Sequence, residues 1–261
     1  MSTMTAPEVT TGGPSAVQPP TLSRLVRVEL RKSADTRAGR WLLLVIGLAA
    51  LAVVGLELFV EDAPTTFGDY LAFTQIPVGI LLPVLGVLLV TSEWSQRTAM
   101  TTFALVPQRS RVLTAKVLAA SLLAVLGVAA SALAAGVGTL LTPVFTDSAM
   151  DWAITGAQLA QVVLLQVVYV LAGVALGVLL LNSPLAIVVY FVLPTAFTIL
   201  VNTVTTLDWV RDWLDLSSTT LPLYHGEIDG QGWLQLATSA VVWVVLPTAL
   251  GWQRIRRAEI A

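Results

Sequence analysis

Six long apolar runs dominate this sequence and restrict it to one class of fold. They extend approximately over residues 41–60, 71–91, 117–142, 158–181, 185–204 and 234–252. About 20 mostly apolar residues are enough for a helix to cross a membrane. Inside lipid, a helix satisfies all its own backbone hydrogen bonds. We therefore expect an all-α membrane protein with six transmembrane helices, in one domain that covers residues 22–261.

The composition agrees with this interpretation. The 261 residues are 56% hydrophobic and only 11% charged, with a mean hydropathy of +0.83. A soluble domain carries about 25% charged residues, so most of this surface must face lipid. The tail at residues 1–21 is rich in threonine, proline and glycine, and we expect it to be disordered. The first apolar run begins near Trp41, which is too far along the chain for a cleavable signal peptide.

Basic residues predict which side of the membrane each connection occupies. Thirteen of the 14 lysine and arginine residues lie in the amino-terminal tail, in the connection between the second and third runs, or in the carboxyl-terminal tail. The opposite side contains only Arg211 among the basic residues, together with several acidic residues. Six spans place all three basic segments on one side, so we expect both termini in the cytoplasm.

Two further stretches are amphipathic and too polar to span. Residues 22–37 place leucine and valine among arginines, which predicts a helix lying on the inner leaflet. Residues 206–216 precede the last run and contain two tryptophans, which favour the headgroup region. We expect this second stretch to form a partly re-entrant outer segment. At helical spacing, Asp208, Asp212 and Asp215 would share its water-facing side.

The sequence contains no recognisable catalytic constellation. It lacks cysteine, and its one histidine, His225, is expected to be a solvated loop residue. No phosphate-binding glycine-rich loop is present, so the chain is not expected to bind ATP by that route. Glu57 is the only charged residue within the predicted spans. An intramembrane charge suggests function, but Glu57 lies near the outer end of its span, where it can reach water, so a structural or interfacial role is favoured.

The fourth run has a polar face. Its residues cluster within about 140° of one another around a helix, and they are Gln158, Gln161, Gln166 and Tyr169. Gly173 and Gly177 continue the same side with a Gly-x-x-x-Gly spacing. One interpretation is the lining of a transport pathway. The other, slightly favoured, is close helix packing, in which small residues permit close approach and amides bond across helices. A partner copy of the chain could supply the packed surface.

The connection between the second and third runs resembles a known family. Its residues are Glu93, Arg97, Thr98, Pro107, Arg109, Ser110, Arg111 and Lys116. They are similar to a Glu-x-x-x-[Gly/Arg]-Thr stretch, a Pro-x-x-[Arg/Ser]-Arg turn and a following lysine. This pattern resembles the permease subunit of ABC transporters of the type-2 exporter superfamily, particularly small six-span permeases of high-GC bacteria. The break between the fourth and fifth runs is similar to the family's second inner turn.

The resemblance implies a function and a set of partners. The chain would be a transmembrane subunit in a bacterial inner membrane, and it would form the pathway for a lipophilic or amphipathic compound with a second copy or a related permease. Separate ATP-binding subunits would hold ATP and magnesium, so this chain would be no enzyme and would carry no cofactor. The resemblance assigns ATPase coupling to the connection from Glu93 to Arg111. Membrane lipids are expected partners, and nucleic acid is not.

Two alternatives stay open at this point. One is an ATP-independent secondary transporter or channel, although the sequence shows neither paired midplane charges nor inverted repeats. The other is a non-transporting membrane scaffold or immunity protein. A neighbouring gene with a phosphate-binding loop would favour the exporter over both.

Overall fold

The computed structural model describes residues 20–60, 66–96, 98, 108–226 and 228–257, and the described chain is almost entirely helical. A parallel β-bridge joins Thr66 and Asp151. The elements are α1 (Leu22–Asp35), α2 (Arg37–Glu57), α3 (Phe67–Ser95), α5 (Arg109–Phe145), α6 (Gly156–Leu180), α7 (Ser183–Thr203), η1 (Thr205–Leu207), α8 (Asp208–Leu214), α9 (Leu216–His225), α10 (Gly230–Ala240), η2 (Val241–Val245) and α11 (Leu246–Arg257). The predicted disordered tail at residues 1–21 lies outside the described residues, except for its last two positions.

Six helical segments in the described chain are long and apolar enough to cross a membrane. They are α2, α3, α5, α6, α7 and the continuous segment Gly230–Arg257, which comprises α10, η2 and α11. The prediction of a multi-pass, six-span membrane protein is confirmed at this level. α5 has 37 residues and is therefore about 55 Å long, well beyond the hydrocarbon thickness of a bilayer. Both α3 and α5 extend beyond the spans predicted from hydropathy.

The core forms where α3 packs against α6. A β-carbon on Gly173 would lie 2.4 Å from the backbone oxygen of Pro83, and one on Gly177 would lie 3.2 Å from that of Val87. Only glycine allows the two helices to approach this closely. The Gly-x-x-x-Gly pattern therefore marks a packing face within the chain itself.

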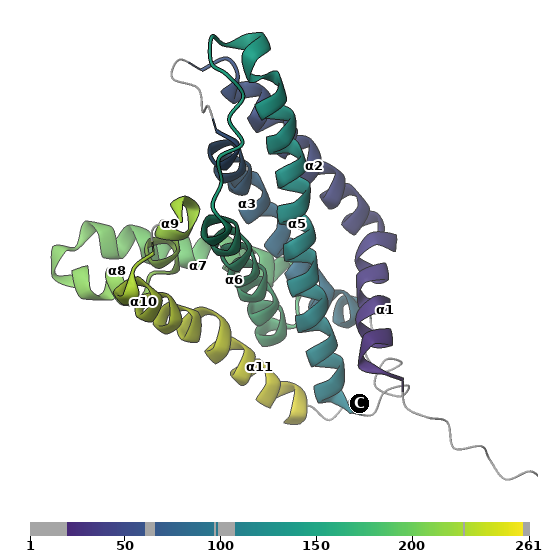
Figure 1. Ribbon diagram of the computed structural model, residues 1–261. Helices are drawn as coiled ribbons and strands as arrows, with labels where there is room; N and C mark the ends of the chain where they lie inside the picture. Colours follow the sequence, from purple (N-terminus) through teal and green to yellow (C-terminus); the bar gives the residue numbers. More distant parts are fainter. Residues whose placement is uncertain (1–19, 61–65, 97, 99–107, 227, 258–261) are drawn as a thin grey trace, which may run out of the picture.

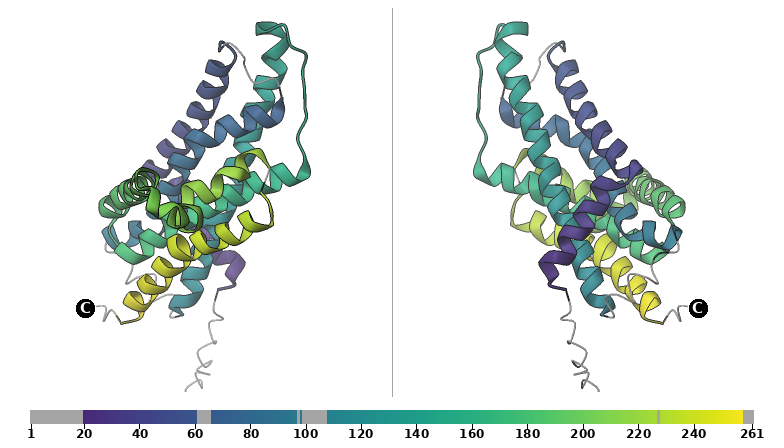
Figure 2. Two further views of the ribbon diagram at one scale, coloured as in Figure 1. Left: turned by 90° about the vertical axis from the view of Figure 1, so that its left-hand side faces the viewer. Right: turned by 90° about the vertical axis from the view of Figure 1, so that its right-hand side faces the viewer.

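α1 is the predicted amphipathic helix, and its apolar face contacts protein. Val26, with neighbouring leucines, packs on Leu89 of α3 and on Ala115 and Ala119 of α5. Thr36 both ends α1 and caps the first turn of α2, because its side chain accepts a hydrogen bond from Gly39 N. α1 thus lies against α5 at the end of the molecule where α5 begins and α11 ends (Figures 1 and 2).

The fourth and fifth spans are separate helices, as the Asn182-Ser183-Pro184 break predicted. Leu181 ends α6 in the left-handed conformation, with φ of 54°. Asn182 then caps α7 by accepting a hydrogen bond from Leu185 N. The reversal takes only two residues, so α6 and α7 remain neighbours.

The segment before the last span differs from its prediction. Residues 206–216 do not form one amphipathic helix, because the chain passes from η1 into α8, breaks at Asp215 and resumes as α9. Asp208 is exposed, as expected, and Asp212 is half-exposed with 47% of its side chain accessible. Asp215 is not exposed, since only 1% of its surface is accessible and its side chain caps α9. Assigning Asp215 to the water-facing side was wrong because helical periodicity does not continue through a cap.

The last span contains a π-helical turn at η2, just before Pro247. Proline lacks the N–H that would bond the carbonyl four residues earlier, and a π turn is one way to accommodate that loss. The turn places Trp243 toward α8, where its indole Nε1 donates to the Leu214 carbonyl at 2.8 Å. The same ring meets Phe197 of α7 edge to face at 5.6 Å.

Candidate functional site

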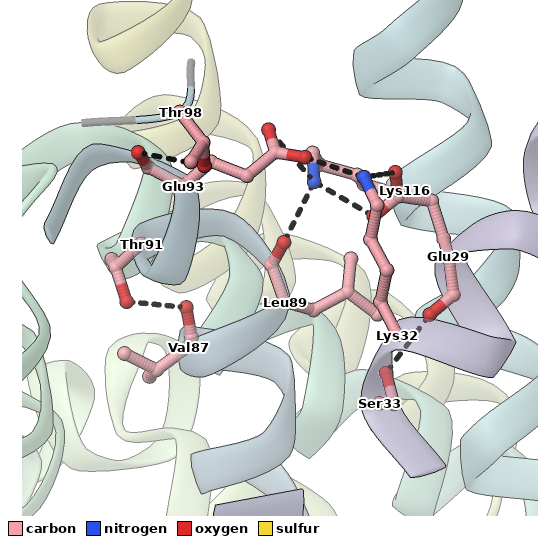
Figure 3. Close-up of polar contacts among 9 residues, drawn as sticks. All are labelled: Glu29, Lys32, Ser33, Val87, Leu89, Thr91, Glu93, Thr98 and Lys116. Carbon is pink, nitrogen blue, oxygen red and sulfur yellow. Dashed lines mark hydrogen bonds and ion pairs between the residues drawn. The ribbon is translucent and has the colours of Figure 1, made fainter. Parts of the chain in front are cut away.

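Four charged side chains from three helices form a cluster at one end of the bundle. α1 contributes Glu29 and Lys32 from one face, since they are three residues apart on a helix. Glu93 comes from the last turn of α3, and Lys116 from the second turn of α5. We call these four residues the inner cluster (Figure 3).

Each lysine of the inner cluster bridges both carboxylates. Lys116 Nζ lies 2.7 Å from Glu29 Oε2 and 3.4 Å from Glu93 Oε2, and Lys32 Nζ lies 2.9 Å from Glu29 Oε1 and 2.6 Å from Glu93 Oε1. Lys116 also donates to the Leu89 carbonyl of α3 at 2.8 Å. All three of its donors are therefore satisfied, and the cluster has no net charge.

The inner cluster is buried except on the Lys32 side. Glu29, Glu93 and Lys116 are each less than 10% accessible, whereas 44% of the Lys32 side chain is exposed. Burial lowers the pKa of Lys32, but the hydrogen bond to Glu93 and the charges of both carboxylates outweigh it, so this pKa lies above its ordinary value. Removing one member of such a network leaves an uncompensated buried charge, which is far more costly than never having had the network.

Further polar contacts join the helices at the same end. Arg109, at the start of α5, donates to the Ile255 carbonyl near the end of α11 at 2.6 Å. Arg254 of α11 donates to the Leu179 carbonyl at the end of α6 at 3.0 Å. Thr98 closes α3, because its backbone N–H donates to the Glu93 carbonyl at 2.8 Å. Five of the longer helices therefore meet at this end through polar groups of α1, α3, α5, α6 and α11.

The structure brings several of the predicted coupling residues together. Glu93 and Arg109 line the same small cavity of about 20 Å³, together with Lys116. The Thr98 hydroxyl donates to the backbone carbonyl of Glu93. Arg111 is half-buried in the first turn of α5. Arg97 and Pro107 lie outside the described residues, and so does the predicted pairing of Arg97 with Glu93.

The polar face of α6 is directed toward other helices of the same chain. Gln166 Nε2 donates to the Val78 carbonyl of α3 at 3.4 Å, and Gln161 Nε2 to the Gly226 carbonyl at 3.5 Å. The Tyr169 hydroxyl lies 2.9 Å from Thr220 Oγ1 of α9. Gln158 is half-exposed beside Gly68 at the start of α3. Gln161, Gln166 and Tyr169 therefore each contact another part of the same chain through this face.

Sequence analysis did not single out Glu29. It counted Lys32 and Lys116 among the basic residues that predict membrane orientation, and Lys116 was also the last residue of the permease-like motif. A usable signal was nevertheless present, because these two are the only lysines among 14 basic residues. A lysine ammonium is compact and donates in three directions, whereas arginine presents a flat fork. The acceptors around Lys116 lie in three directions, which suits a lysine ammonium and not an arginine side chain.

The remaining candidates lie apart from this cluster. Glu57 is the last residue of α2, and His225 is the last of α9. Across the part of the chain that the structure describes, no group of three or more histidine or acidic side chains is arranged to hold a metal ion. Comparison of the sequence with models of known protein families gives no match, and comparison with curated proteins gives none either.

Proposed function

We propose that this chain is the transmembrane permease subunit of an ATP-driven ABC exporter in a bacterial inner membrane, with both termini in the cytoplasm. It provides a pathway for a lipophilic or amphipathic compound. ATP and magnesium bind to separate ATPase subunits, and a second permease copy or a related permease completes the pathway. The motif around Glu93 and Arg109 supports this proposal, together with six spans and a one-sided distribution of basic residues.

The inner cluster is the observation that carries the proposal. The segment from Glu93 to Arg111, to which the resemblance assigns ATPase coupling, comprises the end of α3, the connection at residues 96–108 and the start of α5. Glu93 and Lys116 tie the ends of both helices to α1 through contacts of 2.6 and 2.7 Å, and they lie 3.4 Å from each other. A load applied to that connection is therefore shared among three helices at once. This is the mechanical property that a subunit driven by an external ATPase requires.

The placement of the charges also weighs against an ATP-independent transporter. Secondary transporters hold coupling ions near the midplane, on discontinuous helices. Here Glu93 lies two residues before the end of α3, and Lys116 lies seven residues after the start of α5. A buried charge network at helix ends is better suited to holding a docking connection in place than to forming an ion pathway.

Membrane topology gives the first test. Reporter fusions after residues 150 and 230 are expected to be exported, and fusions after Arg109 and Arg257 to be cytoplasmic, because basic connections are retained inside. The measurement is paired alkaline phosphatase and fluorescent-protein activity for each fusion. A cytoplasmic signal at residue 150 would contradict the six-span arrangement with both termini inside.

Association with an ATPase gives the second test. The purified chain is expected to hydrolyse no ATP alone and to co-purify with the ABC ATP-binding subunit encoded beside it. Because charged contacts that a partner desolvates are worth about 2–5 kcal/mol, Arg97→Ala should weaken this association by at least ~10-fold. Glu93 is unsuitable for this test because it belongs to the buried inner cluster.

The matched control is Arg256→Ala, which removes an exposed arginine from α11 at the same end. It should change association less than about twofold, as is usual for an exposed charge. Equal losses from both substitutions would indicate general electrostatic attraction instead of a docking site. A chain that binds no ATP-binding subunit would favour the scaffold or immunity alternative.

A further inference from the structure

An aromatic cavity of about 340 Å³ lies away from the inner cluster, among α3, α6, α7, α9 and η2. The described lining includes five aromatic rings, those of Tyr169, Tyr190, Phe191, Tyr224 and Trp243. Its volume is in the range of pockets that hold small organic ligands. Aromatic faces carry negative electrostatic potential, so this wall favours a flat apolar group or a cation.

A buried carboxylate stands beside this cavity. Asp215 directly precedes Leu216 and Ser217, both of which line it, and only 1% of Asp215 is accessible. Its oxygens accept from Thr198 Oγ1 at 2.7 Å and from Ser218 N and Oγ at 3.0 and 2.6 Å. These donors are neutral, and no ion pair formed by the described residues includes Asp215. A buried carboxylate that is held only by neutral donors attracts a cation that comes close to it.

A further acceptor lies at the α3 wall of the cavity. Gln166 Oε1 is buried and accepts no hydrogen bond from the described residues. Gly79 lines the cavity, and a β-carbon there would lie 3.9 Å from this oxygen. Glycine therefore leaves the amide close to the cavity. Among the lining residues that the structure describes there is no lysine or arginine.

We propose that this cavity binds a lipophilic organic cation, which places its charge near Asp215 and its apolar groups against the five rings. Cation–π contact, a desolvated carboxylate and an amide acceptor all favour positive charge, and the apolar lining favours a hydrophobic body. That this cation is the exported compound rests on the proposed function. That the cavity binds a cation is argued from the cavity and its neighbouring residues alone.

The test measures binding of tetraphenylphosphonium to the full chain in nanodiscs by equilibrium dialysis, with empty nanodiscs as background. Triphenylphosphine oxide is the neutral probe of similar size. Saturable binding of the cation is expected, at least ~10-fold tighter than that of the neutral probe. Because one ion pair at low dielectric is worth more than a tenfold change in affinity, Asp215→Asn should weaken cation binding by ~10-fold or more.

Two further variants make the result decisive. Asp212→Asn removes a half-exposed carboxylate three residues away and should leave cation binding within about twofold. Phe191→Leu keeps an apolar side chain but removes one ring, and it should weaken binding about threefold, as loss of one cation–π contact does. If Asp215→Asn fails to fold, Phe191→Leu decides the question.

Equal affinity for the cation and the neutral probe would overturn the proposal, and so would no saturable binding of the cation. Unchanged binding by a folded Asp215→Asn variant would do the same. The assay contains no ATPase, so these failures are distinguishable from a failure of the exporter proposal, which association with the ATP-binding subunit tests.

Discussion

Lys116→Met is expected to destabilise the protein by about 3–5 kcal/mol, because it removes one positive charge from a buried network and leaves two carboxylates facing only Lys32. Methionine matches the length of the lysine stem, so the loss is that of the ammonium group and its three bonds. The measurement is the free energy of unfolding in detergent micelles, followed by helical circular dichroism during denaturant titration.

The control and a rescue variant separate charge from packing. Arg31 is exposed on α1. Because a surface substitution usually has a small effect, Arg31→Met should change the free energy of unfolding by no more than about 0.5 kcal/mol. Adding Glu29→Gln and Glu93→Gln to Lys116→Met removes the uncompensated negative charge and should restore much of the stability. A single variant as stable as the parent would show that the inner cluster carries no net electrostatic stabilisation.

Gly173→Ala is expected to prevent α3 and α6 from reaching their present separation. Its β-carbon would lie 2.4 Å from the Pro83 oxygen, 3.1 Å from the Pro83 carbonyl carbon and 3.3 Å from its α-carbon. All three are backbone atoms, so no side chain can rotate away. Overpacking of this kind costs about 1–3 kcal/mol or more, against a gain of about 1 kcal/mol in helix propensity. The unfolding temperature in detergent should fall.

Gly47→Ala is the matched control for this substitution. A β-carbon on Gly47 would meet nothing within 4 Å, so only the gain in helix propensity applies and the unfolding temperature should rise slightly. If the two alanine variants had equal unfolding temperatures, the close contact between α3 and α6 would not be a determinant of stability.

The spans and the principal helix packing could be predicted from sequence because each depends on a local pattern. Apolar runs of about 20 residues predicted the six helices that could cross a membrane, and the spacing of Gly173 and Gly177 predicted a close helix contact. The short break at Asn182 predicted that the fourth and fifth runs are two helices. In each case the signal lies within one element and follows its own periodicity.

The inner cluster could not be predicted in this way. Glu29 and Lys116 are 87 positions apart, and nothing near Glu29 distinguishes it from a solvated acid in a basic helix. The prediction that Asp215 faces water was wrong for a related reason, since the burial of this residue depends on how α9 packs against α6 and α7. Contacts between distant elements determine the environment of a charge, and a hydropathy profile contains no record of them.

The wide separation of the inner cluster in the chain has a consequence for biogenesis. Glu29 and Lys32 leave the ribosome together, and their three-residue spacing lets them pair at once within α1. Glu93 is synthesised 61 residues after Lys32, and Lys116 later still. Until the start of α5 has been synthesised, Glu29 has only Lys32 as a counter-charge, and the apolar face of α1 lacks its contacts with Ala115 and Ala119. The inner cluster can therefore close only after parts of three helices have been made, and α1 reaches its final packing well after its own synthesis.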